Sequence, residues 1–226
     1  MIKWTTWRLS VILTAAALWT GICVTGTRIA QAETYIAGQA GVTVPYSLND
    51  LTFTGNSGLV TSNFDLKTSV AYGAKIGHYF DAVKWLGVEG EVFNTTPHLK
   101  QQNVAAVLPG FGTFAGTEAG HTLRVTTAAF NVVVRSQCGE LEPYAGAGIG
   151  LFMAHLQQAG VSNQNSTTPG LNALAGLRYR IGEHVALFGE WKFNYTKLDF
   201  SETSAAEGFK ATYRAHHFML GIGYHF

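Results

Sequence analysis

Charged side chains recur at every second position inside otherwise apolar segments, and this spacing defines the main candidate site. The residues concerned are Lys75, Glu89, Glu91, Arg178, Glu190 and Lys192. Amines and carboxylates on one face of neighbouring strands can form ion pairs, or can line a path for ions. We expect Lys75 to lie close to Glu91, with Glu190 and Lys192 approaching from the opposite wall.

Histidine and serine are the remaining residues that could carry chemistry. The eight histidines are scattered, and no spacing of His, Cys, Asp or Glu is typical of a metal centre. We therefore expect no metal and no other cofactor. His217 could act as a base for Ser201 or Ser204 in the preceding loop, because nucleophilic catalysis needs the two groups within hydrogen-bond reach. The spacing alone does not establish such a pair, and we assign no catalytic residue.

The composition indicates that most of the surface does not face water. Charged residues make up 13% of the 226 positions and aromatic residues 12%, with 26 glycines and only 5 prolines. Soluble domains carry about 25% charged residues. The charge balance is close to neutral, which gives no reason to expect binding to nucleic acid.

The first 32 residues have the pattern of a secretory signal peptide. Lys3 and Arg8 precede an apolar stretch, and Ala30-Gln31-Ala32 supplies a cleavage site. We expect cleavage after Ala32 and a mature domain covering 33–226. That domain keeps a single cysteine, Cys138, so it cannot form an internal disulfide.

The rest of the chain alternates between apolar and small or polar residues with a period of two, as strands do. Eight segments of about ten residues follow this pattern, which is the length that a tilted membrane strand needs. They lie near 36–44, 70–77, 86–92, 127–135, 145–153, 171–180, 185–195 and 214–226. In the last segment the large apolar positions include Leu220, Ile222, Tyr224 and Phe226.

The links between these segments alternate in length. Short links fall near 81–84, 136–141 and 182–183, and long ones run over about 45–67, 94–120, 157–169 and 199–211. Short periplasmic turns and long external loops are typical of outer-membrane barrels. The sequence therefore predicts an all-β fold, an eight-stranded antiparallel up-and-down transmembrane β-barrel.

The two faces of the strands indicate which side meets lipid. A soluble barrel has its apolar face inside, but here the charges in the middle of the strands share a face with glycine and alanine. The lumen of an eight-stranded barrel is just wide enough for side chains to fill it. We expect the charged face to line the lumen, where both signs neutralise one another, and the apolar face to contact lipid.

Two motifs resemble a known family. Pro143-Tyr144-Ala145-Gly146-Ala147-Gly148-Ile149-Gly150 and Leu86-Gly87-Val88-Glu89-Gly90-Glu91 are similar to strands of the small outer-membrane β-barrels related to the OmpA transmembrane domain, OmpX and the opacity proteins. The resemblance covers 33–226. It implies a Gram-negative cell outer membrane, with outer-membrane lipid and lipopolysaccharide as surroundings.

The resemblance also implies a partner for the last strand. Leu220, Ile222, Tyr224 and the terminal Phe226 are similar to the signal that the barrel-assembly machinery recognises. At the external end of the same strand, Arg214 and His216 face outward, where lipid phosphates lie. Because arginine pairs well with phosphate, we expect a lipopolysaccharide contact there.

Function is less specified than fold, because the family includes adhesins, structural proteins and others. We expect a structural or surface-interaction, adhesion-like protein with a charged, plugged lumen, whose long loops could bind a host or envelope partner. One alternative is a narrow pore or transporter of small or hydrophobic solutes. A second is an outer-membrane enzyme that modifies lipid A, although the His-x-Ser arrangement of the lipid A deacylases is absent.

Overall fold

The computed structural model describes residues 33–53, 60–61, 66–97, 102–108, 112–118, 122–137, 139–157, 164–200 and 208–226. Residues 1–32 lie outside this part of the chain, so cleavage after Ala32 stays a prediction. Cys138, Ser201 and Ser204 are outside it as well. No helix within the described ranges is long and apolar enough to cross a membrane.

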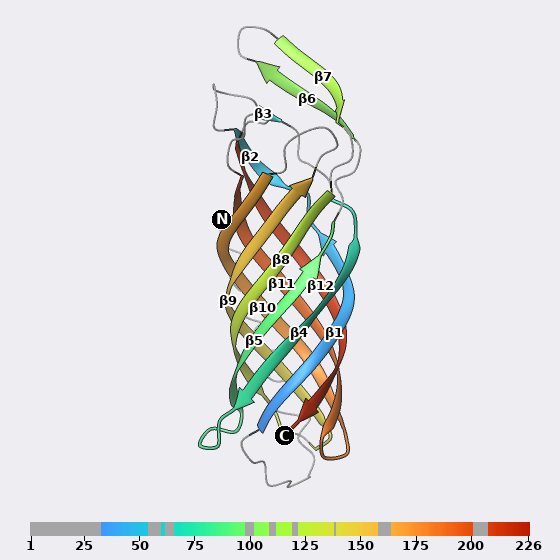
Figure 1. Ribbon diagram of the computed structural model, residues 1–226, viewed down its shortest axis with the longest axis vertical. Helices are drawn as coiled ribbons and strands as arrows, with labels where there is room; N and C mark the ends of the chain where they lie inside the picture. The colour runs from blue at the N-terminus through green and yellow to red at the C-terminus, as the bar shows by residue number, and fades with distance from the viewer. Residues whose placement is uncertain are drawn as a thin grey trace, which may run out of the picture.

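Eight long strands form a closed antiparallel barrel, which confirms the predicted fold class (Figure 1). In chain order they are β1 (Glu33–Pro45), β4 (Ser69–Tyr79), β5 (Leu86–Thr95), β8 (Thr122–Arg135), β9 (Leu141–Gln157), β10 (Gln164–Ile181), β11 (Val185–Phe200) and β12 (Phe209–His225). Each strand pairs with the next, and β12 pairs with β1 from Tyr35↔His225 to Pro45↔Ala215. The wall therefore has no free edge over the length of β1, as lipid requires.

Four shorter strands lie in the two long links at one end. β2 (Asn49–Phe53) pairs with the external end of β12 and continues the line of β1. β6 (Gln102–Leu108) and β7 (Gly112–Glu118) form a hairpin that pairs with β3 (Val60–Thr61). This small sheet projects beyond the barrel (Figure 1). The predicted loop over 94–120 therefore contains a hairpin.

The opposite end carries the short links, the start of β1 at Glu33 and Phe226. The backbone N–H of Phe226 donates to the carbonyl of Thr34 over 2.9 Å. Gly139 and Gly182 have φ of 73° and 75°, a left-handed conformation that tight turns use and that glycine adopts without strain. In outer-membrane barrels this end faces the periplasm.

One predicted loop is shorter than the sequence suggested. We expected a link over 157–169, but β9 extends to Gln157 and β10 begins at Gln164. Pro169 therefore lies within a strand. The ladder between β10 and β11 ends at the adjacent pair Gly170↔Thr196, which fits the missing N–H of Pro169.

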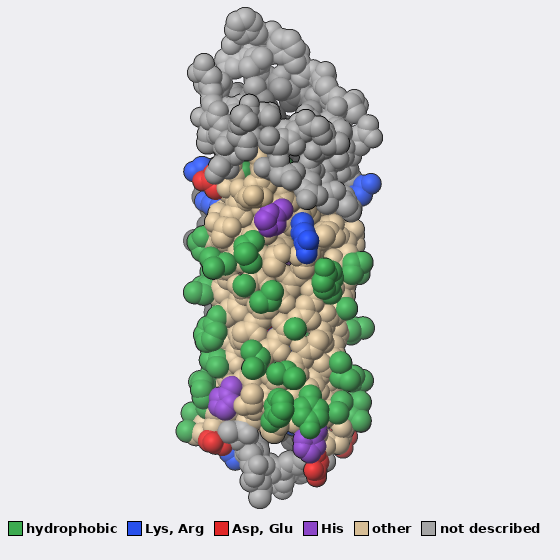
Figure 2. Space-filling view, in the orientation of Figure 1, with side chains coloured by type: hydrophobic (Ala, Val, Ile, Leu, Met, Phe, Trp, Pro, Cys, Tyr) green, Lys and Arg blue, Asp and Glu red, His purple; other side chains and the backbone are tan. Residues whose placement is uncertain are grey.

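The outer face is apolar along the middle of the barrel. Among its most exposed side chains are Leu220 at 74%, Ile149 at 67% and Val70 at 63%. Figure 2 shows hydrophobic side chains over the middle of the visible face, with lysine, arginine and acidic side chains towards the two ends. The predicted assignment of the apolar face to the outside is confirmed by this exposure.

Candidate functional site in the barrel lumen

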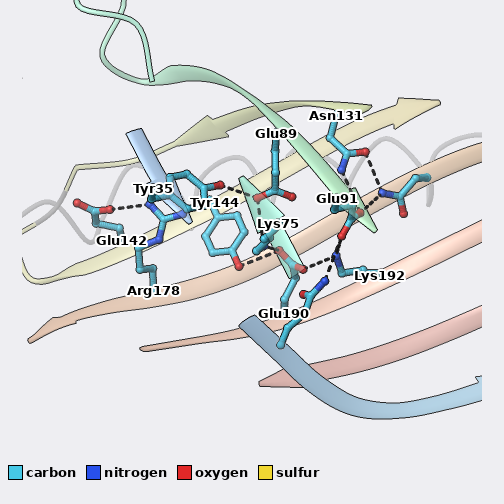
Figure 3. Close-up of polar contacts among 12 residues, drawn as sticks. Tyr35, Lys75, Glu89, Glu91, Asn131, Glu142, Tyr144, Arg178, Glu190 and Lys192 are labelled. Carbon is cyan, nitrogen blue, oxygen red and sulfur yellow. Dashed lines mark hydrogen bonds and ion pairs between the residues drawn. The ribbon is translucent and has the colours of Figure 1, made fainter. Parts of the chain in front are cut away.

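Five charged side chains form a chain of alternating sign across the middle of the lumen (Figure 3). The order of contact is Glu89, Lys75, Glu190, Lys192 and Glu91. The Nζ of Lys75 lies 3.1 Å from Glu89 Oε2 and 2.7 Å from Glu190 Oε2. The Nζ of Lys192 lies 2.8 Å from Glu190 Oε1 and also contacts Glu91 Oε2. We call these five residues the ionic chain.

Neutral donors stabilise the carboxylates at the two ends of the ionic chain. The hydroxyl of Tyr35 donates to Glu89 over 2.5 Å. The amides of Asn172 and Asn131 donate to Glu91 Oε1 over 2.8 and 3.1 Å. Hydrogen bonds to a charged group are roughly twice as strong as neutral ones, so these donors help to hold three carboxylates beside only two ammonium groups.

Lys75 and Glu91 lie close together as expected, but they do not form an ion pair with each other among the contacts of the described residues. The two residues are opposite one another in the ladder of β4 and β5. The Lys75 ammonium nevertheless contacts Glu89 and Glu190. A lysine has four side-chain carbons, so its charged end is placed by what lies across the lumen rather than by its ladder neighbour.

A second charged layer fills the lumen at the periplasmic end. Glu33 contacts Arg135 Nη1 at 2.6 Å and also contacts Arg180 and His225. Glu142 accepts from Arg180 Nε over 2.8 Å and lies 3.6 Å from Arg135 Nη1. We call this group, together with Arg178, the periplasmic layer.

Tyrosine rings separate the two charged layers, and Arg178 lies against them. Its guanidinium carbon is 4.6 Å from the ring centre of Tyr35, 5.3 Å from that of Tyr144 and 5.6 Å from that of Tyr79. Its Nη1 is 3.6 Å from Glu142 Oε2. We predicted Arg178 in one network with Lys75. Its ion pair is with Glu142 of the periplasmic layer, and it faces the ionic chain only through the tyrosine rings.

The described lumen is balanced in charge. Its carboxylates are Glu33, Glu89, Glu91, Glu142 and Glu190, and its permanent cations are Lys75, Arg135, Arg178, Arg180 and Lys192. The ionic chain has one excess negative charge and the periplasmic layer one excess positive charge, His225 aside. Because an unpaired buried charge costs several kcal/mol, such balance favours a filled interior over an open aqueous path.

Sequence reasoning missed part of this arrangement although the signal was present. Glu33, Glu142 and His225 fall on the inward parity of their strands, but they lie at strand ends, where the period of two is hard to extend. Parity alone would have found them. It could not have given their level in the lumen, which depends on the stagger between strands.

The external end of the lumen is closed by apolar side chains, which the sequence did not predict. The buried residues here are Leu48, Leu66, Leu123, Val125, Phe152, Ala154, Leu198, Phe200, Ala211, Tyr213 and Ala215. We call them the upper apolar cluster. Leu48 and Leu66 come from the first long link, so this link contributes to closing the barrel.

His217 lies in the lumen between the upper apolar cluster and the ionic chain. It is 1% exposed, and its Nδ1 lies 2.8 Å from the hydroxyl oxygen of Thr43. Ser201 and Ser204, the candidate nucleophiles, are outside the described residues. Within the described part of the chain, no three His, Cys, Asp or Glu side chains are grouped as a metal site would require.

The two residues predicted to contact lipopolysaccharide have different surroundings. Arg214 is half-buried on the outer face, and its Nε has no partner among the described residues. His216 is held by its neighbours: Nδ1 accepts from the indole N–H of Trp191 over 3.1 Å, and Nε2 is 2.9 Å from the Tyr46 hydroxyl. Both ring nitrogens of His216 are engaged by these aromatic residues, and its contact with lipopolysaccharide stays a prediction.

The four residues of the predicted assembly signal are all exposed, three of them on β12 and Phe226 directly after it. Leu220, Ile222, Tyr224 and Phe226 are 74%, 56%, 46% and 69% exposed. Their strand is also the one that closes the barrel against β1. Recognition by the assembly machinery remains a prediction.

Comparison with known proteins now identifies the family. The sequence matches the outer membrane protein beta-barrel domain over residues 15–226. The chain belongs to this family. Membership agrees with the resemblance that the sequence predicted. The protein therefore lies in the cell outer membrane, and its apolar outer face contacts lipid.

One solved structure supports the fold at low sequence identity, and two others serve for comparison only. The outer membrane protein OprG from Pseudomonas aeruginosa has a TM-score of 0.60 and 17% identity, covering 87% of this chain and 96% of its own. Ail of Yersinia pestis, solved with the heparin analogue sucrose octasulfate, has a TM-score of 0.49 and 17% identity, with 87% and 99% covered. Neisserial surface protein A has a TM-score of 0.49 and 15% identity, and the match covers 85% of this chain and 97% of its own. No curated protein matches the sequence.

Proposed function

We propose that this outer membrane protein beta-barrel domain is a closed, non-conducting barrel with a structural or surface-interaction role. The observation that carries the proposal is the ionic chain, in which Lys75 and Lys192 alternate with three glutamates across the lumen. The periplasmic layer and the upper apolar cluster lie on either side of it along the barrel. A solute moving along the barrel axis would have to displace all three.

The interaction surface in this proposal is the external end. The hairpin of β6 and β7 projects beyond the rim, where a host or envelope partner would meet it first (Figure 1). Rigid barrels commonly carry binding residues on such extensions. The proposal includes no enzymatic step, and it assigns the hairpin, rather than the lumen, to partner binding.

The proposal extends to lipopolysaccharide at the same rim. Exposed Lys197 and Lys210 lie on the outward face of β11 and β12, together with Arg214. The ammonium of Lys210 is 3.0 Å from Asp199, so the group keeps an excess of positive charge. Phosphate groups of lipopolysaccharide are the anions found at this depth of the membrane.

A swelling assay tests the closed barrel. The folded protein is placed in liposomes, and the rate of swelling in small sugars is compared with protein-free liposomes. Folding is checked by the shift in gel mobility between boiled and unboiled samples. We expect a shift in mobility and no added swelling. Swelling by the folded protein would favour the alternative function, a pore for small solutes.

The role of the hairpin needs a separate variant. Deletion of residues 102–118 should leave the heat-modifiable barrel intact and reduce the attachment of cells carrying the protein to epithelial monolayers. If attachment matches that of cells with the full-length protein, the hairpin is not the interaction surface, and a structural role becomes the remaining proposal.

A further inference from the structure

The barrel wall is interrupted between β10 and β11 near the external rim. The ladder between them ends at Gly170↔Thr196. By contrast, β10 stays paired with β9 as far as Gln164↔Leu156, and β11 stays paired with β12 as far as Phe200↔Phe209. The first six residues of β10 (164–169) and the last four of β11 (197–200) therefore have a ladder on one side only. We call this gap in the ladder the seam.

Pro169 explains where the seam begins. Its carbonyl accepts a hydrogen bond from the hydroxyl of Thr196 over 2.9 Å, so its backbone faces β11. Proline has no N–H to continue the ladder on that side. Beyond it the strands are joined through side chains: the Asp199 N–H donates to Ser166 Oγ over 2.8 Å, and the hydroxyls of Thr168 and Thr196 are 3.0 Å apart.

A pocket lies against the outside of the seam. Its volume is about 520 Å³, and its lining includes Thr168 and Pro169 on one side and Lys197 and Leu198 on the other. Leu198 is itself a member of the upper apolar cluster, with 0% exposure. The seam is therefore a thin boundary between this pocket and the apolar external part of the lumen.

At the inner edge of that apolar part, the lumen presents polar atoms that lack partners among the described residues. Both amide atoms of Asn194, the hydroxyl of Tyr213 and Nε2 of His217 are buried without a hydrogen-bond partner among the described residues. Asn194 is opposite Ala215 in the ladder, so it lies between Tyr213 and His217 on the neighbouring strand. Each unpartnered buried group costs about 1–3 kcal/mol, which water or the polar end of a ligand would recover.

We propose that the external lumen binds an apolar molecule with one neutral hydrogen-bonding end group, which enters from the outer leaflet through the seam. The apolar part would lie among the upper apolar cluster, and the end group would contact Asn194, Tyr213 and His217. A neutral end group fits because the charges of the lumen as a whole sum to zero, so a charged end group would add a net buried charge. This site lies above the ionic chain and does not need an open axial pore.

The proposal is tested with two probes, decan-1-ol and decane, added to the folded protein in lipid nanodiscs. NMR follows the side-chain amide of Asn194 and the ring of His217 after isotope labelling. Decan-1-ol should shift both signals to saturation, and decane should bind about tenfold more weakly, the value of one hydrogen bond. Shifts confined to outward residues such as Leu220, or no saturation, would mean partition into lipid only and would overturn the site.

Two variants separate the entry route from the site. Pro169→Ala restores an N–H opposite Lys197 and should slow the binding of decan-1-ol about tenfold or more, whereas Pro143→Ala, on β9 at the other end of the barrel, should leave the rate unchanged. Equal rates in all three proteins would overturn entry through the seam.

The second variant, Asn194→Leu, removes the end-group contact without altering the seam. The His217 ring serves as the reporter. The affinity of the variant for decan-1-ol should fall about tenfold, to the affinity of the parent protein for decane. An unchanged affinity in a heat-modifiable, folded variant would overturn the proposed site even if entry through the seam were supported.

Discussion

Lys75 and Glu190 belong to strands that do not pair with each other, yet Lys75 Nζ and Glu190 Oε2 are 2.7 Å apart. The contact crosses the lumen from β4 to β11. It is therefore available only in the closed barrel, where it joins opposite walls. The same ammonium is 3.1 Å from Glu89, so one side chain neutralises two carboxylates.

We predict that Lys75→Ala strongly destabilises the barrel. The substitution leaves Glu89 and Glu190 without their shared cation, and breaking a buried ion pair costs about 3–5 kcal/mol. Urea unfolding in lipid vesicles, followed by gel mobility, would measure the loss in free energy of unfolding. Lys67→Ala, at an exposed lysine, is the matched control and should change it by less than about 0.5 kcal/mol. Similar losses for the two variants would contradict the assignment.

Removing both charges should be less harmful than removing one. In the double variant Lys75→Met with Glu190→Gln, the ionic chain loses one cation and one anion, so the net charge of the lumen is unchanged. We expect it to recover at least about 1 kcal/mol relative to Lys75→Met alone, as neighbouring sites are coupled. Strict additivity in a double-mutant cycle would argue against direct contact between the two side chains.

Inward and outward glycines should respond differently to alanine. A Cβ added at Gly148 would lie 2.0 Å from the carbonyl oxygen of Phe130, whereas one at Gly90 would have nothing closer than 3.9 Å. Gly148→Ala should therefore lower the free energy of unfolding by about 1–3 kcal/mol, the usual cost of overpacking. Gly90→Ala should be close to neutral in the same urea titration, and a reversed order would indicate that the faces are assigned wrongly.

The terminal aromatic should matter for assembly more than for stability. We predict that Phe226→Ala reduces the amount of folded barrel in the outer membrane of cells, measured by heat-modifiable bands, but leaves refolding from urea into vesicles nearly unchanged. Phe130→Ala is the control, because Phe130 is also an outward aromatic, with 55% exposure, and is far from the C-terminus. If both variants reduced the amount of folded barrel in the outer membrane equally, Phe226 would have no special role in assembly.

Arg214→Ala should lower the amount of lipopolysaccharide that co-purifies with the protein. Arginine binds phosphate oxygens in a bidentate manner, which alanine cannot replace. Lys84→Ala removes a cation from the short link between β4 and β5 at the opposite end, so its co-purified lipopolysaccharide should match that of the parent protein. No difference between the two variants would count against a contact at Arg214.

The period of two in the sequence was sufficient to predict the barrel and its two faces. Alternation through Leu220, Ile222 and Tyr224 fixes which residues of β12 point outward, because successive side chains of a strand alternate. The same rule places Lys75 and Glu190 in the lumen. It does not say which charges meet, since that depends on stagger between strands and on the reach of each side chain.

Other features depend on contacts distant in sequence. The closure of the external end by Leu48 and Leu66 comes from a link in which no periodic pattern exists to read. Pro169 looked like a loop residue because proline interrupts ladders, yet it lies inside β10 at the point where the ladder with β11 stops. In both places a local pattern could not reveal which element lies beside it.

The closed lumen is tested most directly by recording single-channel conductance in planar bilayers. The purified mature chain is first shown to be folded by its mobility shift on boiling, and is then added at increasing concentration. Because the ionic chain spans the lumen, we predict no steady conductance above that of the bare bilayer. Sustained, uniform current steps from the folded protein would contradict a plugged barrel and would make transport of small solutes its leading function.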